Sequence, residues 1–537
     1  MEMRSGIKLW LQGGVASISV LVLADRVGAI VTSDFAIDVA SEIGADVWYA
    51  AGYTGTGARV ANVEAGHGWS GHSSLSFSGL YQGSGGTSGW TDHATAVSFA
   101  LAGRGTSAAN RGIAFGSSMS SGAIATSING SQFGFTGLSF RDGLLPHVDV
   151  GGVGSDVVNF SWGDGSTQGN DWLNTATDAV VAQTRSLVVV ASGNTGFGSN
   201  RVGSPARGFN VLSVGALTRT GDGFDAVAGW SSGGAVDYWD PATGGVVRGA
   251  RAGVDLVAPG SDLRLAGTGG ADDWRGGQAG TSFASPIAAG GAALLVDAGR
   301  ARFGGGVSID PRTLKSVLMN SARKIDGWDN GQRLVDGVLI TDRALDLRSG
   351  AGALDLGRAY EQYLGGDADL EGEVGGEVGE IGWDFARVAA DASTEYRFAE
   401  ALEEGSTLTL TLNWMSDARW DAIGNGEGLG VSAGSLDDLD LEVWRVGEDG
   451  GSDVLVARSE SRYDSVEHLS FEIGQTAEYV ARVVWRGETF DLRDDVDTEY
   501  FSIAWSGVFA GDVVPGPTTL TVLAGWLVVG MRPARRR

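Results

Sequence analysis

Short apolar runs alternate with longer stretches of small residues throughout residues 45–365. Four of these runs are predicted strands, at 59–63, 156–162, 187–191 and 210–216. Near-continuous apolar strands that alternate with helical stretches are typical of a parallel sheet buried on both faces. The pattern therefore predicts an α/β domain with a parallel β-sheet flanked by helices. Functional residues are expected beyond the carboxyl ends of its strands.

A different pattern begins after residue 365. Residues 366–380, GDADLEGEVGGEVGE, are acidic and rich in glycine, and we predict a linker there. Residues 381–512 then hold alternating or β-branched segments, with no segment of helical length between them. These predicted strands lie at 406–414, 439–446, 468–473, 478–485 and 500–505. The second domain is thus expected to be all-β, either a β-sandwich or a jelly roll.

The first residues have the pattern of a secretory signal. Within residues 1–24, Arg4 and Lys8 precede an apolar run that ends in a candidate cleavage site, Val22-Leu23-Ala24. This order of charge, apolar run and cleavage site is typical of a signal peptide. The alternative is a buried first strand or helix. A signal peptide predicts a secreted or cell-envelope protein, whose mature chain begins with a short segment, residues 25–44.

The last residues, 513–537, combine a Pro-Gly-Pro step, an apolar stretch from about 520 to 531 and a cluster of arginines. The apolar stretch is short for a membrane span of about 20 residues. The arrangement resembles the PEP-CTERM sorting tails of Gram-negative bacteria, although Gly516 stands where those tails usually have glutamate. The resemblance implies transient membrane attachment through the tail and cleavage by an exosortase-type enzyme. An ordinary tail anchor is the alternative.

Composition excludes several kinds of chemistry. The net charge of −27 argues against a nucleic-acid partner, because phosphate binding requires Lys and Arg. The chain has no cysteine, which excludes disulfides, a thiol nucleophile and thiolate zinc sites. With 88 glycines, many tight turns and close backbone contacts are expected.

One serine stands at the start of a predicted helix, in the stretch GQAGTSFASPIAAGGAALL at 277–295. Ser282 could cap the helix, which contributes about 1 kcal/mol. It could also be a nucleophile, because a helix N-terminus favours negative charge that develops beside the hydroxyl. A nucleophilic serine needs a base, an acid that orients the base, and donors for an oxyanion.

The sequence offers one candidate for each of these partners. Among the five histidines, His93 opens the predicted helix DHATAVSFALA, whose small residues allow close packing around the ring. Glu64 stands at the carboxyl end of the predicted strand at 59–63, where a buried carboxylate needs a partner. Asn194 follows the predicted strand at 187–191, where its amide can face a cleft. Capping or turn formation remains the structural alternative for His93 and Asn194.

Together these residues resemble the subtilisin-like serine peptidases. The chain order of acid, histidine, asparagine and serine is that of the family, and GTSFASP at 280–286 is similar to its nucleophile motif. HATAV, ASGN, VVNFSWG, SPARGFNVLSVGA, WSSGG and VDLVAPG follow the family's order as well, and the likeness spans residues 45–365. One departure is Glu64, where the family has aspartate. Sedolisins also use glutamate, but they replace the histidine and the oxyanion asparagine.

The resemblance implies a serine endopeptidase that hydrolyses peptide bonds. Ser282 would be the nucleophile, His93 the general base, Glu64 the orienting acid and Asn194 the oxyanion donor. The substrate cleft would have two walls, formed by Ser161, Trp162 and Gly163 and by Ala191, Ser192 and Gly193. We expect extended polypeptide substrates bound by β-augmentation, with a mild preference for apolar side chains. No cofactor is expected for the chemistry.

The second domain resembles the β-sandwich that follows the catalytic domain in some larger subtilases, through SLDDLDLEV at 435–443 and YDSVEHLSF at 463–471. Two interpretations of its acidic stretch remain. Asp437, Asp438 and Asp440 could bind a structural calcium ion, which prefers oxygen ligands. They could equally form a solvated acidic turn.

Two other functions fit the same motifs. Glu64 could have impaired the triad, which would leave a pseudo-peptidase that binds peptides in the cell envelope without cutting them. The same residues could alternatively serve an esterase or amidase. Covalent reaction of Ser282 with a fluorophosphonate distinguishes an active enzyme from the pseudo-peptidase. A comparison of activity on ester and protein substrates distinguishes an esterase or amidase from a peptidase.

Overall fold

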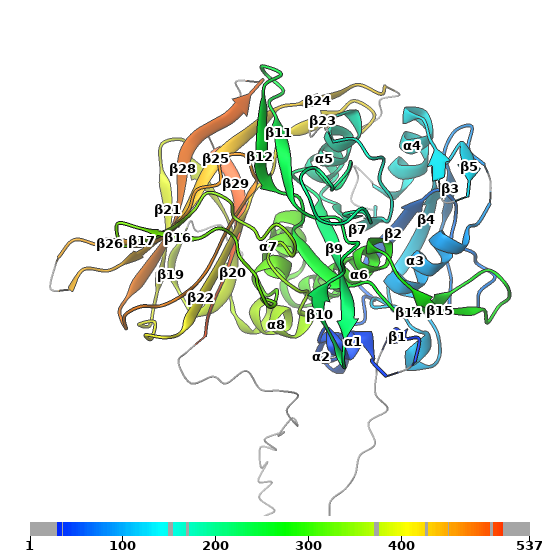
Figure 1. Ribbon diagram of the computed structural model, residues 1–537, viewed down its shortest axis with the longest axis horizontal. Helices are drawn as coiled ribbons and strands as arrows, with labels where there is room; N and C mark the ends of the chain where they lie inside the picture. The colour runs from blue at the N-terminus through cyan, green and yellow to red at the C-terminus, as the bar shows by residue number, and fades with distance from the viewer. Residues whose placement is uncertain are drawn as a thin grey trace, which may run out of the picture.

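The computed structural model describes most of the chain between residues 29 and 508. The described ranges are 29–34, 36–87, 89–130, 132–148, 154–167, 171–369, 375–424, 428–448, 451–493 and 498–508. The predicted signal peptide and C-terminal tail lie outside them. We refer to residues 29–365 as the N-terminal region and to residues 366–508 as the C-terminal region. Figure 1 shows these regions side by side, with the strand-rich C-terminal region on the left.

A mainly parallel sheet forms the centre of the N-terminal region. Its strands follow the order β10-β9-β8-β7-β2-β4-β3, and β13 pairs with β9. Every pair is parallel except β9 with β10, which is antiparallel. The bounds are β2 (Arg59–Glu64), β3 (Leu80–Gln82), β4 (Ser118–Ala123), β7 (Val157–Phe160), β8 (Leu187–Ala191), β9 (Leu212–Thr220), β10 (Gly223–Val227) and β13 (Leu256–Pro259). The predicted α/β architecture is confirmed.

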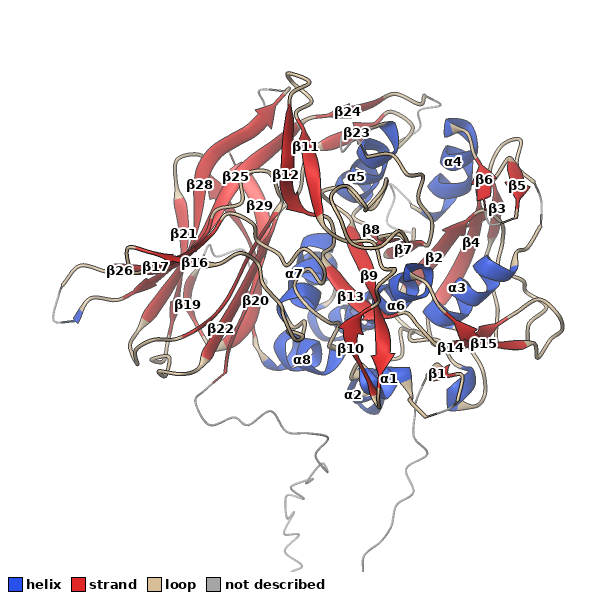
Figure 2. Ribbon diagram, in the orientation of Figure 1, coloured by secondary structure: helices blue, strands red, loops and turns tan. Residues whose placement is uncertain are grey.

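Helices cover this sheet, as Figure 2 shows. Their bounds are α1 (Val39–Glu42), α2 (Ala45–Ala50), α3 (Asp92–Ala102), α4 (Gly137–Leu144), α5 (Trp172–Thr184), α6 (Thr281–Phe303), α7 (Pro311–Asn320) and α8 (Leu356–Tyr360). The long helix α6 is apolar enough to span a membrane by composition, yet 94% of its most apolar window is buried inside the protein. Gly290 permits this burial, because a Cβ there would lie 2.6 Å from the Cβ of Ile113. A larger residue would push α6 away from the loop that follows α3.

The C-terminal region is built from two sheets of mainly antiparallel strands. One has the order β16-β17-β26-β25-β28-β21-β19, and the other has the order β18-β20-β29-β22-β27. The bounds are β16 (Arg333–Val335), β17 (Val338–Thr341), β18 (Asp367–Asp369), β19 (Gly376–Val378), β20 (Ile381–Ala389), β21 (Ser393–Phe398), β22 (Thr407–Asn413), β25 (Ser435–Arg445), β26 (Val454–Ser459), β27 (Val466–Glu472), β28 (Tyr479–Asp491) and β29 (Thr498–Val508). Side chains from both sheets share one apolar core, which includes Leu410, Leu441 and Ile503.

Smaller sheets complete the fold. They are β1-β14-β15, β5-β6, β11-β12 and β23-β24. Their bounds are β1 (Val31–Thr32), β5 (Ser127–Asn129), β6 (Gln132–Gly134), β11 (Ala235–Trp239), β12 (Val246–Ala252), β14 (Leu263–Ala266), β15 (Trp274–Gln278), β23 (Ala418–Trp420) and β24 (Val431–Ala433).

The two regions exchange segments, so the boundary between them differs from the sequence boundary. Strands β16 and β17 come from the N-terminal region, but β17 pairs with β26 of the C-terminal region. In the other direction, Trp420 of β23 is fully buried in the core of the N-terminal region. The predicted linker also has strands of its own, because β18 and β19 pair with β20 and β21. The N-terminal region therefore contributes strands to a C-terminal sheet, and the C-terminal region contributes a side chain to the N-terminal core.

Polar contacts between the regions are buried as well. The side chain of Asn210 donates to the carbonyl of Ser416 at 2.8 Å and accepts from the backbone N–H of Ser416 at 2.9 Å. Nearby, Ser316 of α7 hydrogen-bonds Ser502 of β29 at 2.9 Å. An asparagine that satisfies both backbone groups of one residue fixes the position of that residue in two directions.

A buried lysine and a buried histidine meet at the same interface. Lys324 Nζ lies 2.9 Å from Nε2 of His468 and donates to the carbonyl of Ala351 at 2.6 Å. His468 Nδ1 lies 2.8 Å from the hydroxyl of Thr411, which donates to Asn320. Burial, with the Lys324 charge adding to it, lowers the pKa of His468 well below its usual value. Burial, followed by the charge of Arg358, lowers the pKa of Lys324 to about 7.

The lowered pKa of Lys324 predicts that the protein becomes more stable as the pH rises above about 7. In the unfolded chain a lysine keeps its proton up to about pH 10.4. The unfolded state therefore binds more protons between these pH values, and the free energy of unfolding should rise by up to about 1.4 kcal/mol per pH unit. Chemical denaturation across this range checks the slope. Lys324→Met should lose this part of the slope, and an identical slope in both proteins would contradict the assignment.

Candidate active site

The side chains of Glu64 and His93 meet above the central sheet. Glu64 is the last residue of β2, and His93 lies in the first turn of α3. Thr91 caps the N-terminus of this helix, because its hydroxyl accepts a hydrogen bond from the backbone N–H of Ala94 at 3.1 Å. Ala94, Thr95 and Ala96, which follow the histidine, are buried against the sheet. The ring of His93 is thereby held at the end of β2.

Glu64 is a buried carboxylate with two donors. Its Oε2 lies 3.0 Å from Nδ1 of His93, and its Oε1 accepts the backbone N–H of Ser161 at 3.1 Å. Only 2% of the Glu64 side chain is exposed, against 44% of the His93 side chain. Burial lowers the pKa of His93, but the charge of Glu64 and its hydrogen bond raise it by more, so that the net shift is upward. Glu64 thus favours the protonated imidazole and directs Nδ1 away from the cleft.

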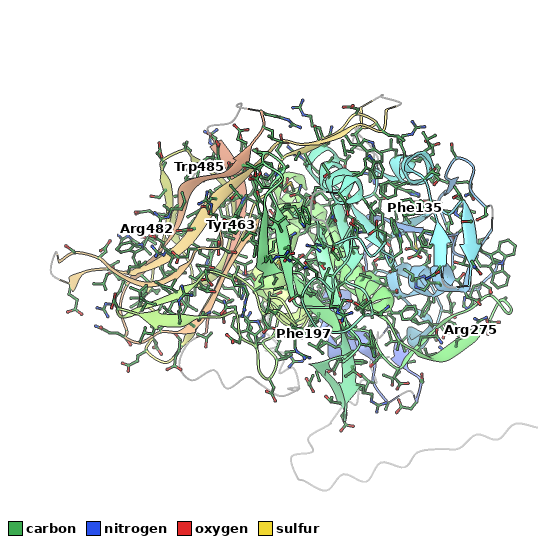
Figure 3. All side chains as sticks on the ribbon, turned by 45° about the horizontal axis from the view of Figure 1, so that its top comes forward. Phe135, Phe197, Arg275, Tyr463, Arg482 and Trp485 are labelled. Atoms are coloured by element: carbon green, nitrogen blue, oxygen red, sulfur yellow. The ribbon has the colours of Figure 1, made fainter. Side chains whose placement is uncertain are left out.

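The neighbouring carboxylate of Asp92 points elsewhere. It pairs with Arg275 at 2.6 Å and accepts the backbone N–H of Thr268 at 3.1 Å. Arg275 lies at the edge of the molecule in Figure 3. Of these two neighbouring acidic side chains, Glu64 is therefore the one that orients His93.

Ser282 lies in the first turn of α6 and faces the same cleft as His93. Gly280 precedes the helix with φ 159°. In the described part of the chain, the Ser282 hydroxyl donates to the carbonyl of Ser161 at 3.1 Å and makes no hydrogen bond with His93. Catalytic hydrogen bonds are often long or misaligned without substrate.

The orientation of Asn194 is fixed by its oxygen. Oδ1 accepts the backbone N–H of Thr281 at 2.9 Å and lies 3.1 Å from the hydroxyl of Thr281. The Nδ2 amide is therefore left for the cleft that Asn194 and Ser282 both line. The backbone N–H of Ser282, in the first turn of α6, has no acceptor within the helix. These two donors suit an oxygen that develops negative charge beside Ser282.

The cleft around these side chains has two adjoining parts. One, of about 770 Å³, is lined by Glu64, His93 and Ser282. The other, of about 430 Å³, is lined by all six predicted wall residues, namely Ser161, Trp162, Gly163, Ala191, Ser192 and Gly193. Trp162 is 7% exposed, and its indole N–H donates to the carbonyl of Val63 at 2.9 Å. The structure therefore brings the predicted triad, oxyanion donor and wall residues together at the carboxyl ends of β2, β7 and β8.

A polar network that the sequence analysis did not identify lies beneath the site. Asn62 of β2 donates to Ser98 of α3 at 3.0 Å, and its oxygen accepts Asn159 of β7 at 3.2 Å. Asn159 also donates to the hydroxyl of Ser161 at 2.9 Å and accepts Ser285 of α6 at 2.7 Å. The network joins the elements that carry Glu64, His93 and Ser282. Its signal in the sequence is the presence of asparagine within two otherwise apolar strands.

Apolar residues on one side of the cleft were also missed. Ile128, Phe133 and Phe135, on or beside the β5-β6 hairpin, line the larger part of the cleft. Ring centroids of Phe133 and Phe135 lie 5.8 Å and 5.4 Å from that of Trp162. In Figure 3, Phe135 lies in the opposite half of the molecule from Trp485 of the C-terminal region. Strands β5 and β6 were too short to be recognised in the sequence pattern.

The acidic stretch proposed for calcium or for a solvated turn is neither a loop nor a turn. Asp437, Asp438 and Asp440 lie within β25, and Asp437 and Asp440 are 4% and 5% exposed. Asp440 pairs with Arg486 at 2.6 Å, so a guanidinium already balances its charge. Among the described residues, no group of three or more His, Cys, Asp or Glu is arranged to hold a metal ion. The solvated turn is corrected to a largely buried strand, and calcium binding by these residues stays a prediction.

One family model and several solved structures are similar to this chain. A sequence model of the subtilase family of peptidases, S8, matches residues 70–352, more than half of the chain. Among solved structures, the patellamide maturation protease PatA is 24% identical over 58% of this chain and 98% of its own, with a TM-score of 0.42. The prenylagaramide maturation protease PagA is 21% identical over 60% and 99%, with a TM-score of 0.44. A protease from Pseudoalteromonas arctica is 19% identical over 60% and 94%, with a TM-score of 0.40.

The pairing with Glu64 predicts how His93 titrates. The imidazole of His93 should lose its proton above pH 6.5, the usual histidine value. Glu64→Gln should move this titration below that value, because the charge is removed while burial remains. Nuclear magnetic resonance of the imidazole protons measures the titration of His93 in the native protein and in the variant. His72, which does not contact Glu64, is the internal control. An unchanged His93 titration in the variant would contradict the pairing.

Proposed function

The chain belongs to the subtilase family and is a serine-type endopeptidase, and on this basis we propose that it acts through a triad of Ser282, His93 and Glu64 with Asn194 as oxyanion donor. The observation that carries this proposal is the buried Glu64 carboxylate, 3.0 Å from His93 Nδ1, beside a cleft that Ser282 also lines. The added methylene of glutamate does not prevent the contact. The pairing supports an active enzyme over the pseudo-peptidase alternative.

In the first half of the proposed reaction, the Ser282 hydroxyl turns from the Ser161 carbonyl toward His93. Its oxygen attacks the peptide carbonyl carbon, and Nε2 of His93 takes its proton. The carbonyl oxygen becomes an oxyanion, which accepts hydrogen bonds from Asn194 Nδ2 and the Ser282 backbone N–H. His93 then gives the proton to the leaving amine as the C–N bond breaks. The acyl group remains esterified to Ser282.

In the second half, water replaces the amine. His93 takes a proton from water, the hydroxide oxygen attacks the ester carbon, and the same two donors hold the oxyanion. The Ser282 oxygen leaves and recovers its proton from His93, which restores the enzyme. Glu64 keeps Nδ1 protonated throughout and stabilises the imidazolium in both halves. This chemistry uses only side chains and backbone groups of the protein.

We propose extended polypeptides as the substrates. The backbones of residues 161–163 and 191–193 border the cleft, which suits a peptide bound as an added strand. Trp162, Phe133 and Phe135 make one part of the cleft apolar and support a preference for apolar side chains. The C-terminal region is proposed to be a β-sandwich, because its two sheets share one apolar core.

Export of the enzyme is also a proposal. Secretion or a location in the cell envelope is proposed from the sequence of residues 1–24. A Gram-negative-type bacterium is proposed from the resemblance of residues 513–537 to PEP-CTERM tails. The tail at residues 513–537 would attach the enzyme transiently to the membrane until an exosortase-type enzyme cleaves it. Both segments lie outside the described residues.

Loss of the Ser282 hydroxyl should abolish the activity. The full-length protein is expected to hydrolyse casein and to react with a fluorophosphonate, and Ser282→Ala should do neither. Ser285→Ala is the matched control, because this hydroxyl lies one turn along α6 and bonds Asn159 instead of facing the cleft. It should still be labelled. An unlabelled native protein, with labelling that appears in Glu64→Asp, would contradict the proposal and favour a peptide-binding protein.

Loss of the Asn194 amide should slow the chemical step. Asn194→Ala is expected to lower kcat about 10²–10³-fold, the effect found for one oxyanion donor in a related enzyme. KM should change little, because this hydrogen bond forms mainly in the transition state. Steady-state kinetics on one peptide substrate separates the two constants. Asn110→Ala, whose side chain accepts from Arg264 and lines neither part of the cleft, should leave both constants unchanged. A rise in KM alone would contradict the oxyanion role.

A further inference from the structure

A segment of the C-terminal region lies on the helices beside the catalytic cleft. We call residues 418–424 and 428–433 the strap; they contain β23 and β24. In Figure 1 the strap (yellow) reaches from the C-terminal sheets to α5. Its apolar side chains Ala418, Trp420, Ala422 and Ile423 belong to the core of the N-terminal region and not to the core of the C-terminal sheets. The strap is therefore a structural part of the catalytic region.

Trp420 is the centre of this contact. It is fully buried, and its ring stacks on that of Phe140 in α4, with centroids 5.7 Å apart and an interplanar angle of 15°. The ring of Trp172 in α5 meets Trp420 edge-on at 5.6 Å and Phe140 edge-on at 5.7 Å. Aromatic pairs at such distances contribute beyond the area that they bury. The three rings hold α4, α5 and the strap together.

Phe140 in turn contacts the wall of the cleft. Its centroid lies 5.9 Å from that of Trp162 and 6.1 Å from that of Phe135. Both of those rings line the part of the cleft that contains His93 and Ser282. One ring, Phe140, therefore separates Trp420 from the apolar wall against which a substrate would lie.

Two hydrogen bonds hold the strap in register with α5. The indole N–H of Trp172 donates to the carbonyl of Leu429 at 2.8 Å, and the backbone N–H of Trp420 donates to the side chain of Gln183 at 2.7 Å. Leu429 also lies against the start of α4, where a Cβ on Gly137 would be 3.0 Å from its Cδ1. The strap can therefore shift only if these contacts break. Such a shift would expose the side of α4 that Leu429 and Trp420 cover.

We propose that Trp420 is a positioning residue for substrate selection, which holds Phe140 and through it Phe135 and Trp162 so that the cleft accepts a bulky apolar side chain of the substrate. The inference rests on the proposed endopeptidase function. Trp420 touches neither the triad nor the cleft, and its effect on substrate binding is transmitted by packed rings. The C-terminal region thereby helps to set the specificity of the enzyme, because one of its own side chains supports the cleft wall.

The test compares substrate selectivity in the full-length protein and its Trp420→Leu variant. Peptides that differ only by phenylalanine or alanine, at each position near the cleaved bond in turn, identify the position with the largest preference. There the variant should lower the phenylalanine-to-alanine ratio of kcat/KM about tenfold, through KM of the phenylalanine peptide. kcat on the alanine peptide and the rate of fluorophosphonate labelling of Ser282 should be unchanged. Trp420→Phe keeps a ring on Phe140 and should retain most of the preference.

Two further variants separate positioning from general stability. Trp505→Leu removes a buried tryptophan from the core of the C-terminal sheets, and it should lower the melting temperature without changing the ratio. Leu429→Ala disturbs the strap at its partly buried edge and should lower the ratio in the same direction, even if Trp420→Leu does not fold.

Three outcomes would overturn the inference. An unchanged ratio in the strap variants would show that the strap does not support the wall. Equal losses on both peptides with slower labelling would show a general structural role. Equal cleavage of the phenylalanine and alanine peptides by the native protein would show that there is no selectivity for Trp420 to support. A native protein that neither cleaves peptides nor reacts with the probe would instead refute the proposed function.

Discussion

The buried carboxylate of Glu64 is the constraint on which the catalytic arrangement depends. An ionised carboxylate in a protein interior costs several kcal/mol unless charged or hydrogen-bonding groups surround it. Here the compensating donors are the ring of His93 and the backbone of Ser161, which come from α3 and from the end of β7. The hydrogen bonds that compensate this buried carboxylate therefore hold the imidazole of His93, the proposed general base, beside the strand that borders the cleft. Glutamate can make this contact because it is the last residue of β2, and its carboxylate lies 3.0 Å from Nδ1 of His93.

The fold could be predicted from the sequence where local pattern determines structure. The apolar run at 187–191 coincides with β8 (Leu187–Ala191), because a strand buried on both faces must be apolar at every position. The paired strands β23 and β24 gave no such signal, since they are three residues each and the apolar side chains of β23 are buried against helices that are distant in the sequence. The same holds for β17, whose partner β26 is more than a hundred residues away.

The sequence located the residues of the candidate site more completely than the residues that support them. Ser282, His93, Asn194 and Glu64 each stand near the end of a recognisable strand or helix, and the resemblance to the motifs of the subtilisin-like peptidases implied that they belong to one site. Asn62 gave only a weak signal, because a polar residue within an apolar strand has meaning only once its neighbours in space are known. It lies 3.0 Å from Ser98 and ties the histidine helix to β2 from below. Such supporting residues depend on tertiary contacts that no spacing rule encodes.

Exchange of segments explains why the two regions cannot be understood as independent domains. β17 completes a C-terminal sheet, while Trp420 completes the core beside the cleft. If the C-terminal region were removed, the rings of Phe140 and Trp172 would lose the Trp420 indole that packs against both of them and become partly exposed to water. Exposure of aromatic surface is unfavourable by about 25 cal/mol per Å², so α4 would be expected to repack and to move the cleft wall with it. A truncated chain that still cleaved peptides would therefore report on an altered cleft, and its selectivity would not describe the whole enzyme.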